Sequence, residues 1–275
     1  MPDEIRTIYL DDDLEVEAYR FKGIMQKFPP HFHEYYVIGF IEEGQRHLVC
    51  KDQEYIINPG DLLLFNPYDI HSCAQIDGKT LDYRCINVTR EIMKKFMKEF
   101  GEEGELPYFT QNVLSNSELV PFLKDIHLKI SREEKEFEKE ELFFTLLEEL
   151  VTDYAGHSIP PPASDQEIEK VCCYLESNYT QKIKLNELSS LIGCSKYKLV
   201  RSFTKQKRIT PYNFLETIRI NHAKKMLEQG IKPIEVALLT GFSDQSHLTK
   251  FFKAWVGLTP KQYMKIFKQG GLGEK

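Results

Sequence analysis

Hydrophobic and polar positions follow two different periods along the chain. From Phe21 to Val88, short runs rich in aromatic and β-branched residues alternate with turn signals, most clearly at residues 35–41 (YYVIGFI) and 62–65 (LLLF). Such runs between Gly, Pro, Asn and Asp are typical of β-strands, and their spacing favours a sandwich or small barrel. After Val88 the apolar positions recur every three or four residues, which indicates amphipathic helices.

Three helices are expected after the strands, and the last two form a pair. They are expected over residues 91–100, 118–130 and 134–154. The apolar positions of the pair allow two interpretations. The pair packs only on the barrel, or it also shares an apolar stripe with a second copy of the chain across a two-fold axis.

A proline-rich segment, HSIPPPAS at residues 157–164, follows the helical pair. Its three prolines cannot continue a helix and favour an extended spacer. We therefore expect a first domain at residues 1–156, a linker at 157–164 and a second domain at 165–275. The expected fold class is α+β with two domains.

The second domain shows helical periodicity throughout and contains one pattern twice. Each copy has a short apolar helix, a turn with glycine, and a second helix with a serine as predicted N-cap, Ser195 or Ser243, 48 residues apart. This order predicts a helix-turn-helix unit. Residues 211–227 begin with proline and predict a long helix between the units. We therefore expect an all-α domain with two helix-turn-helix units joined by a long helix.

The second helix of the later unit, expected to begin at Asp244, has two unlike faces. Apolar side chains recur at i, i+3, i+4 and i+7, at Leu248, Phe251, Phe252 and Trp255. Amide, hydroxyl and lysine groups occupy the other face. Amides hydrogen-bond adenine edges and cations bind guanine or phosphate, so this face suits a DNA groove. Taken alone, the helix also fits an ordinary surface helix whose polar side meets water.

Charge divides between the two expected domains. The whole chain has a formal charge of −6, but residues 165–275 carry 19 Lys and Arg against 10 Asp and Glu, a net of +9. Residues 1–164 therefore sum to −15. A basic domain joined to an acidic one favours a polyanion as partner of the basic domain. The charges by themselves also fit two ordinary domains of unequal composition.

Composition narrows the class of protein. No apolar run approaches the ~18 residues that a membrane helix needs, and the N-terminus, MPDEIRTIYLDDD, is acidic and unlike a signal peptide. We expect a soluble cytoplasmic protein with no membrane partner. The 6 cysteines include no C-x-x-C pair, which favours reduced, mostly buried thiols over zinc ligands or disulfides.

Three motifs of the first domain carry a resemblance to a known family. They are HFH at 31–33, PGD at 59–61 and PYDIH at 67–71. Over about residues 20–90 they resemble the cupin-type sensing domain of AraC-family regulators, which implies a cupin-like β-barrel that binds a small-molecule effector. In enzymatic cupins His-x-His, a Glu four residues on and a later His together hold a metal. Val37 occupies the position of that Glu here, so no cofactor is expected, and a metal site is the less favoured alternative.

The resemblance places effector-binding positions on a small set of barrel residues. They are His31, His33, Tyr36, His71, Tyr83 and Cys85. The histidines allow a second interpretation, as structural residues at the barrel mouth. Glu43 lies near a position where sugar-sensing relatives have arginine, so the class of effector stays open.

The second domain resembles the AraC/XylS family over about residues 165–267. The motifs are IRINHA at 218–223, GFSDQSH at 241–247 and GLTPKQY at 257–263. The resemblance implies a homodimer that binds double-stranded promoter DNA and RNA polymerase and acts as an activator. It places base contacts on Tyr197, Val200, Arg201, Gln245, Ser246 and Lys250. Lysines nearby are expected to bind phosphates, at Lys196, Lys198, Lys205 and Lys253.

The sequence therefore predicts an effector-controlled transcription regulator and not an enzyme. Two other classes remain as alternatives. A metal-dependent cupin isomerase or dioxygenase with an appended binding module would need a full ligand set, which the sequence lacks. A DNA-binding architectural protein without an effector would leave the barrel without a role.

Overall fold

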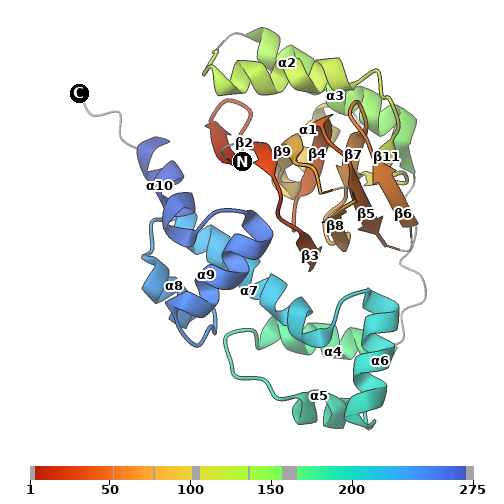
Figure 1. The fold of residues 1–275 in the computed structure, drawn as a ribbon, viewed down its shortest axis with the longest axis vertical. Coiled ribbons are helices and arrows are strands. Elements are labelled where there is room, and N and C mark those ends of the chain that lie inside the picture. The colour runs from red at the N-terminus through yellow and green to blue at the C-terminus, as the bar shows by residue number, and fades with distance from the viewer. Residues whose placement is uncertain are drawn as a thin grey trace. The chain divides into compact units, whose positions relative to one another are not determined.

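The computed structural model describes residues 4–51, 53–76, 78–100, 106–135, 137–156 and 166–270. The chain forms two compact units, one of residues 1–27 and 33–159, the other of residues 28–32 and 160–275. The expected linker at 157–164 lies outside the described residues. Figure 1 shows the strands and first helices of the chain in red to green and the later helices in cyan to blue.

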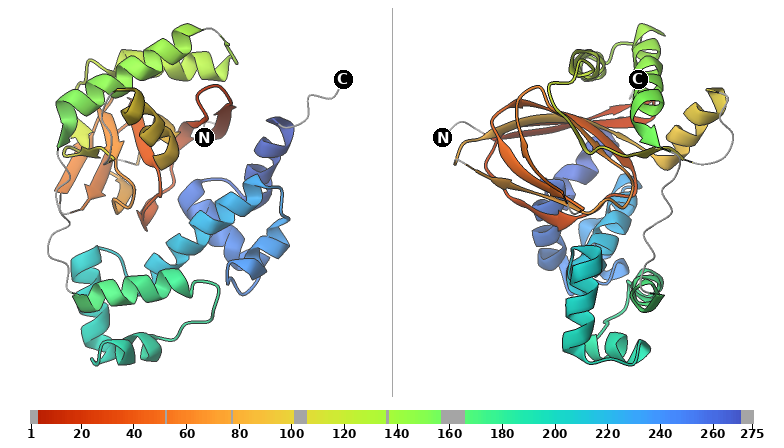
Figure 2. Two further views of the ribbon diagram at one scale, coloured as in Figure 1. Left: turned by 180° about the vertical axis from the view of Figure 1, so that it is seen from behind. Right: turned by 90° about the vertical axis from the view of Figure 1, so that its right-hand side faces the viewer.

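The first unit is built mainly from antiparallel strands. The larger sheet has six strands in the order β1-β2-β9-β4-β7-β11, and β10 pairs with β12. The smaller sheet has four strands in the order β3-β8-β5-β6, of which β3 comes from residues 28–32 of the second unit. The bounds are β1 Ile5–Asp11, β2 Val16–Ile24, β3 Phe28–His31, β4 Tyr36–Glu43, β5 Arg46–Cys50, β6 Gln53–Ile57, β7 Leu62–Phe65, β8 His71–Gln75, β9 Leu81–Val88, β10 Tyr108–Phe109, β11 Val113–Leu114 and β12 Ala155–Gly156. In the right-hand view of Figure 2 the strands curve around a common interior, as in a barrel.

Strand β3, with the sequence FPPH, has no strand signal in the sequence because of its two prolines. It lies at the edge of the smaller sheet, where a proline without an N–H group interrupts no ladder. His31 is its last residue, and the neighbouring strand β8 begins at His71. The edge strand thus brings two of the predicted site residues onto adjacent strands.

The two faces of the larger sheet have different roles, because successive residues of a strand point to opposite sides. One face of β4 belongs to the main hydrophobic core, through Tyr36, Ile38 and Phe40. The other face carries Val37, Gly39 and Ile41. Phe65 of β7 pairs with Val37, and its ring stacks on His71 of the smaller sheet at a centroid distance of 4.1 Å. The second face is therefore turned toward the interior between the sheets.

Helices cover the outer face of the larger sheet. They are α1 Arg90–Glu99, α2 Val120–Ser131 and α3 Phe137–Tyr154, close to the predicted ranges. Figure 2 shows these yellow and green helices outside the curved strands. Lys139 of α3 is buried and donates to Asp11 Oδ2 at 2.6 Å and to Asp13 Oδ2 at 3.0 Å. This ion pair fastens the turn between β1 and β2 to α3.

Apart from β3, the described elements of the second unit are all helices. Its helices are α4 Gln166–Ser177, α5 Leu185–Leu191, α6 Lys196–Lys207, α7 Pro211–Glu228, α8 Pro233–Leu239, α9 Gln245–Val256 and α10 Pro260–Gly270. The predicted long helix α7 begins with Pro211 after Thr210, whose Oγ1 accepts from the backbone N–H of Asn213 at 3.2 Å. Helix α7 contacts α4 and α6, which precede it in the chain, and α8, α9 and α10, which follow it.

A buried ion pair anchors α7. Arg219 donates to Glu216 Oε1 at 2.8 Å, and the same guanidinium reaches the backbone oxygens of Tyr179 and Gln181 at 2.8 and 2.9 Å. Burial raises the pKa of Glu216 while Arg219 opposes that shift. The loop after α4 is thereby tied to the helix that joins the two repeats.

Two compositional predictions can be compared with the structure. All six cysteines are free thiols, and three of them are buried: Cys50, Cys85 and Cys172. None of the helices in the described residues is long and apolar enough to cross a bilayer.

Candidate nucleic-acid interface and barrel ligand site

Helix α6 presents the expected residues of the first helix-turn-helix unit. Ser195 caps it, because Ser195 Oγ accepts a hydrogen bond from the backbone N–H of Lys198 at 3.2 Å, and the predicted N-cap is confirmed. Leu199 and Phe203 are fully buried and fix the inner face. The opposite face exposes Lys196, Tyr197, Lys198, Arg201 and Lys205, with Val200 partly buried.

Helix α9 begins one residue later than predicted, and its N-cap is Asp244. Asp244 Oδ1 accepts from the backbone N–H of His247 at 2.8 Å, and this hydrogen bond lowers the pKa of the Asp244 carboxyl group. The prediction of Ser243 as N-cap is wrong. A carboxylate interacts more favourably than a hydroxyl with the positive end of a helix, and the Ser243 hydroxyl donates to Asp244 Oδ2 at 3.1 Å.

This correction changes the correspondence between the two units. Helix α8 begins 48 positions after α5, but α9 begins 49 positions after α6, because the second turn is one residue longer. Each second helix has 12 residues and ends at a left-handed residue, Arg208 or Gly257, with φ of 57° and 85°. The fully buried pair Leu199 and Phe203 therefore corresponds to Leu248 and Phe252, which are also fully buried.

The corrected correspondence adds one position to those that the sequence predicts. Tyr197 and Arg201 correspond to Ser246 and Lys250, and Val200 corresponds to Thr249. Thr249 is partly buried, and its hydroxyl donates to the backbone oxygen of Gln245 at 2.7 Å. The predicted residues of α9 are all exposed, at Gln245, Ser246, Lys250 and Lys253. Aligning the buried residues Leu199 and Leu248 in the sequence is enough to place Thr249 at the position of Val200.

The two helices are strongly biased toward positive charge. Helix α6 contains five Lys and Arg, α9 contains two Lys, and neither contains an Asp or Glu. Arg201 can pair with both acceptors of a guanine edge, Gln245 can pair with adenine, and exposed lysines can bind phosphates. Each helix therefore carries groups that can distinguish bases on the same face as cations that can bind phosphates. A helix that binds in the major groove needs both.

His247 is held between the turn and α7. Its Nδ1 lies 3.3 Å from Ser243 Oγ, and its Nε2 lies 3.3 Å from the Tyr212 hydroxyl. The ring also packs edge-on against Phe242 and Phe251 at 5.4 and 5.1 Å. These contacts give His247 a packing role at the start of α9.

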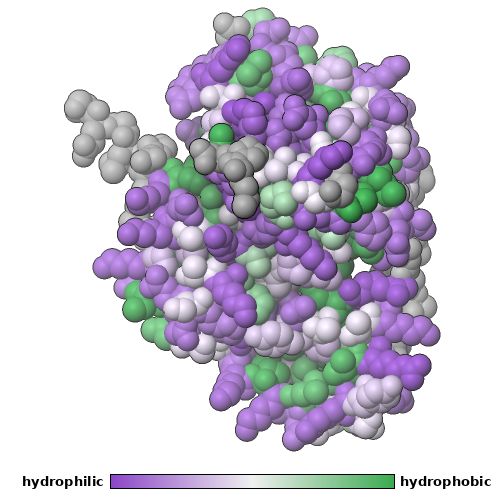
Figure 3. All heavy atoms as spheres, in the orientation of Figure 1, coloured by the Kyte–Doolittle hydropathy of each residue, from purple (hydrophilic) through white to green (hydrophobic). Residues whose placement is uncertain are grey.

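The first helix of each unit exposes apolar side chains. They are Leu185 and Leu191 of α5 and Ile234, Leu238 and Leu239 of α8. Figure 3 shows green among the hydrophilic purple where α5 and α8 lie in Figure 1. Only Leu188 and Ser189 of α5, and Val236 and Ala237 of α8, are buried.

In the barrel, two of the predicted effector residues share the interior face of the larger sheet. Tyr83 and Cys85 of β9 pair with Ile41 and Gly39 of β4. A Cβ atom at Gly39 would lie 2.5 Å from the Tyr83 hydroxyl, so glycine makes room for this phenol. Burial raises the pKa of Tyr83 well above its usual value.

Tyr36 does not join this group. It lies on the opposite face of β4, within the hydrophobic core, and its hydroxyl donates to the backbone oxygen of Pro107 at 2.8 Å. The alternation of β4 is the physical reason: Tyr36 and Val37 must face opposite sides of the sheet. The structure therefore separates Tyr36 from the other predicted effector residues.

Two polar residues of the interior face were not predicted. Glu17 of β2 pairs with Asn87 of β9, and Asn87 Nδ2 donates to Glu17 Oε2 at 3.1 Å. Cys85 Sγ lies 3.8 Å from Asn87 Oδ1. Period-two alternation from Cys85 to Asn87 would have found Asn87, whereas Glu17 required the strand pairing.

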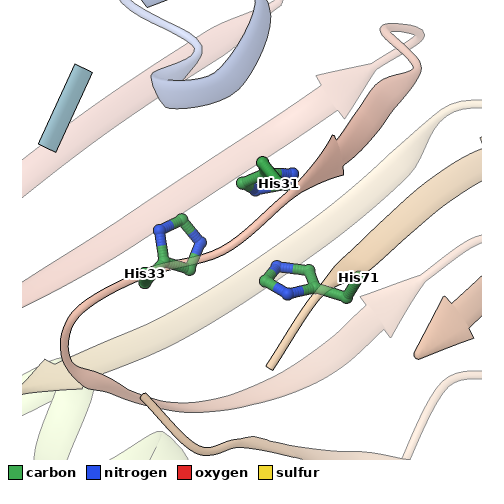
Figure 4. Close-up of side chains that lie close together, drawn as sticks. All are labelled: His31, His33 and His71. Atoms are coloured by element: carbon green, nitrogen blue, oxygen red, sulfur yellow. The ribbon is translucent and has the colours of Figure 1, made fainter. Parts of the chain in front are cut away.

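The structure brings His31, His33 and His71 together. Each offers a ring nitrogen, and these atoms all lie within 4.8 Å of one another. Figure 4 shows the three rings, with His31 at the end of its strand, His33 in the following segment and His71 on another strand. The rings of His33 and His71 are 5.1 Å apart, and His33 stacks on Tyr35 at 4.9 Å.

Backbone oxygens fix two of the three imidazoles. Nδ1 of His31 lies 2.7 Å from the oxygen of Pro29, and Nδ1 of His71 lies 2.9 Å from the oxygen of Asp69. Burial lowers the pKa of His71 to about 4, so its ring is neutral at pH 7. A neutral imidazole that donates through Nδ1 carries its lone pair on Nε2.

The turn before His71 is held by one carboxylate. Asp69 Oδ2 accepts from Asn66 Nδ2 at 2.9 Å and from Asn112 Nδ2 at 3.1 Å, and lies 3.1 Å from Lys51 Nζ. The Asn66 backbone N–H donates to the same oxygen at 3.1 Å. This network determines where the Asp69 backbone oxygen meets His71.

Comparison with known proteins identifies the family of both units. An AraC-like ligand binding domain matches residues 13–147, and a helix-turn-helix domain matches residues 188–266. The HTH-type transcriptional regulator YbfI of Bacillus subtilis is 62% identical over 273 residues, which cover 98% of each chain. The chain belongs to the AraC family of transcription regulators.

More distant proteins share the architecture. A Staphylococcus aureus HTH-type transcriptional regulator, SACOL0084, is 26% identical over 82% of this chain, which spans 31% of that protein. The crystal structure of ToxT from Vibrio cholerae with a bound unsaturated fatty acid has a TM-score of 0.55 and 18% identity, and covers 100% of both chains. At this identity the likeness shows the fold. The predicted two-domain α+β class and the assignment as a regulator, not an enzyme, are confirmed.

Proposed function

We propose that this AraC-family protein is a sequence-specific regulator whose helices α6 and α9 read two segments of promoter DNA. The observation that carries the proposal is the matched geometry of the two helices. Each buries a leucine and a phenylalanine four residues apart, and each exposes polar and cationic groups on the other face. The base-reading residues are Tyr197, Val200, Arg201, Gln245, Ser246 and Lys250, with Thr249 added.

The proposed phosphate contacts are Lys196, Lys198, Lys205 and Lys253. Cations of this kind fix the register of the protein on the duplex and supply the salt-dependent part of the affinity. The proposal places the protein in the cytoplasm with promoter DNA and RNA polymerase, and it assigns an activator role from the family. The proposed domain limits are 1–156 and 165–275, with a linker at 157–164.

Variants of one arginine and one lysine test the DNA-reading proposal. Duplexes selected from a random pool by the full-length protein are used in gel-shift titrations with Arg201→Ala and Lys250→Ala. Each variant is expected to lose about 1–3 kcal/mol of affinity and to relax the preference at one position of the site. Lys261→Ala, an exposed lysine of α10, is the control. Unchanged affinity and sequence preference in both variants would contradict the assignment.

The effector is proposed to bind the interior face of the barrel. Support comes from the residues gathered there: His31, His33, His71, Tyr83 and Cys85. Polar groups inside an otherwise apolar barrel are typical of small-molecule sites. Binding would change the relative populations of two arrangements of the regulator, because only a ligand with different affinities for two states shifts their equilibrium.

A thermal-shift screen tests the effector proposal. Sugars, amino acids, aromatic acids and fatty acids are added to the full-length protein. A true effector at 100 times its Kd is expected to stabilise the unit it binds by about 2.7 kcal/mol. The same compound should stabilise Gly39→Ala less, because the added methyl group displaces the Tyr83 ring. If no compound of these classes raises the Tm, a DNA-binding protein without an effector becomes the better description.

A homodimer is proposed through α2 and α3. These helices expose Phe122, Phe137 and Phe144, with 42, 80 and 39% of each residue accessible. Exposed aromatic residues on neighbouring helices are typical of a protein interface. Light scattering after gel filtration should report twice the chain mass, and the double variant Phe137→Glu, Phe144→Glu should report one. An unchanged mass in the double variant would place the interface elsewhere.

A further inference from the structure

Two arginines of the larger sheet lie opposite each other on its helix-covered face. Arg20 of β2 and Arg84 of β9 are direct partners in the strand pairing. Their side chains share a face with Ala18 and Ile86, which belong to the core under the helices. Directly opposed residues have Cβ atoms about 4.5–5.5 Å apart, and like charges placed there destabilise a sheet. Two arginines in this position need compensating negative charge.

The carboxylates nearby are engaged elsewhere or pair with one arginine alone. Arg84 Nε donates to Glu42 Oε2 at 2.7 Å, in an ion pair that is mostly buried. Asp82, two residues before Arg84 on the same face of β9, accepts instead from the backbone N–H of Gly23 at 2.8 Å. Arg20 Nε is buried, and no hydrogen-bond partner lies near it in the described residues. The second guanidinium group therefore has a buried donor without an acceptor.

A third polar group enters the same layer from α2. His127 is fully buried, and its Nε2 lies 2.9 Å from the backbone oxygen of Tyr19. Because that oxygen can only accept, Nε2 carries the proton and Nδ1 carries the lone pair. Nδ1 is also buried, and no group in the described part of the chain forms a hydrogen bond with it. A buried acceptor without a donor thus accompanies the buried donor of Arg20.

We infer that the layer between α2 and the larger sheet binds a phosphate group beside Arg20, Arg84 and His127. Guanidinium groups pair well with the several oxygen acceptors of a phosphate. Near neutral pH a phosphate group also keeps one proton in part of its population. It can therefore donate to Nδ1 of His127 while it accepts from Arg20, whereas a carboxylate or sulfate ion has no proton to donate at that pH.

The position of the site agrees with entry from solvent. Arg20 is partly buried, and the side chains of Arg84 and Glu42 are 13 and 21% exposed. On β1, the outermost strand of the sheet, Thr7 is the partner of Arg20. A phosphate group can bind there as the free ion or as part of a phosphorylated metabolite. The site goes beyond the proposed function, since it lies on the face of the sheet opposite to the proposed effector site.

Binding should depend on pH through one proton between Nδ1 and a phosphate oxygen. Burial lowers the pKa of His127 to about 4, so the free ring is neutral near pH 7. The groups that face the ring are Tyr9 of β1, edge-on at 6.0 Å, and the charged side chains of Arg84, Glu42 and Arg20. The fraction of phosphate that already carries this proton increases between about pH 8 and pH 6. The affinity for phosphate is therefore expected to increase as the pH falls over this range.

Calorimetric titration of the full-length protein in a chloride buffer tests the inference. The probes are inorganic phosphate, glycerol 3-phosphate, sulfate and acetate, each at about pH 8 and pH 6. We expect a site for one phosphate group per chain that binds sulfate and acetate more weakly. Tighter binding of the ester than of the free ion would indicate a phosphorylated metabolite, and the reverse would indicate free phosphate. Equal affinity for sulfate and phosphate, or an affinity for phosphate independent of pH, would overturn the inference.

Variants separate this site from the basic helices α6 and α9, which also bind phosphates in the proposed function. Arg20→Gln should weaken the pH-dependent binding by about 10- to 100-fold, because charge-assisted hydrogen bonds are lost. Arg20 Nε has no hydrogen bond to lose in the described residues, so the variant is expected to fold. The matched control is Arg132→Gln, at an arginine directly after α2 whose side chain is 62% exposed. Equal phosphate affinity in Arg20→Gln and Arg132→Gln would overturn the inference.

A measurement on wild-type protein covers the case in which a variant fails to fold. Hydrogen exchange is followed by mass spectrometry in phosphate and in chloride of equal ionic strength. Phosphate should slow the exchange of peptides from α2 and β2 and leave those from β6 unchanged. Protection confined to α6 and α9, or no protection, would overturn the inference. Because neither DNA nor a barrel effector is present, failure here leaves the proposed regulatory function untouched.

Discussion

The carboxylate of Asp244 and the backbone N–H of His247 are joined by a hydrogen bond of 2.8 Å, which opens helix α9. Asp244→Ala removes this cap, whereas Asp244→Asn keeps an oxygen acceptor. We expect Asp244→Ala to lower the Tm of the second unit and its affinity for DNA, and Asp244→Asn to do so less. Ser243→Ala should have a smaller effect than Asp244→Ala. Fluorescence of the single tryptophan, Trp255, reports on α9 directly.

The two turn glycines should differ in their tolerance of a side chain. Gly241 has φ of +81°, and a Cβ there would lie 2.7 Å from the backbone oxygen of Tyr179. Gly193 has φ of +63°, and nothing lies within 4 Å of its added Cβ. We expect Gly193→Ala to cost about 1 kcal/mol from backbone strain alone, and Gly241→Ala to cost at least 2–3 kcal/mol, roughly, because a backbone clash is added. Urea titration followed by Trp255 fluorescence measures both, and equal costs would contradict the clash.

His127 should make the first unit less stable in mild acid. Its Nε2 lies 2.9 Å from the backbone oxygen of Tyr19, and burial lowers its pKa to about 4. The unfolded chain takes up a proton near pH 6.5, but the folded chain does not until about pH 4. The free energy of unfolding is therefore unaffected above pH 6.5 and decreases as the pH falls toward 4, by up to roughly 3 kcal/mol.

The pH effect is measured by hydrogen exchange of the β2 peptides at several pH values, corrected for the intrinsic rate. His127→Gln keeps a donor for the Tyr19 oxygen and has no proton to gain, so its stability should depend less on pH than that of wild type. His47→Gln, which changes a half-exposed histidine, should behave as wild type. Parallel curves for wild type and His127→Gln would exclude His127 as the cause.

Lys253 and Thr249 should affect DNA binding in different ways. Lys253→Ala is expected to weaken binding to all duplexes alike and to reduce the slope of log K against log salt by about 1, because one phosphate contact is lost. Thr249→Ala should leave that slope unchanged and alter the preference at one base pair. Gel-shift titrations at several salt concentrations separate the two effects. A change of sequence preference in Lys253→Ala would place that lysine at a base edge.

Local patterns were sufficient to predict most helices and the two helix-turn-helix units. The 3.6-residue period and proline at a helix start placed α7, and a serine before an apolar stripe placed α6. The cap of α9 was misplaced because Ser243 and Asp244 are both good capping residues. Only the three-dimensional turn shows that the aspartate, and not the serine, faces the N–H of His247.

The barrel residues were harder to group. The family resemblance places Tyr36 in the effector set, but Tyr36 is the first residue of β4 and faces the core. Strand β3 could not be predicted because Pro29 and Pro30 oppose a strand except at a sheet edge. The meeting of His31 with His71 follows from the pairing of β3 with β8, which is a long-range contact that no local pattern contains.

The alternation of β4 makes a single polypeptide backbone the boundary between two environments. Val37 and Ile38 are joined by one peptide bond, yet one faces the proposed ligand site and the other contacts the core under α2 and α3. A displacement of β4 by a bound molecule must therefore also move side chains that support the proposed dimer helices. In the proposed regulator, strand β4 alone therefore separates the effector site from the core that supports the dimer helices. The strand itself links the two sites.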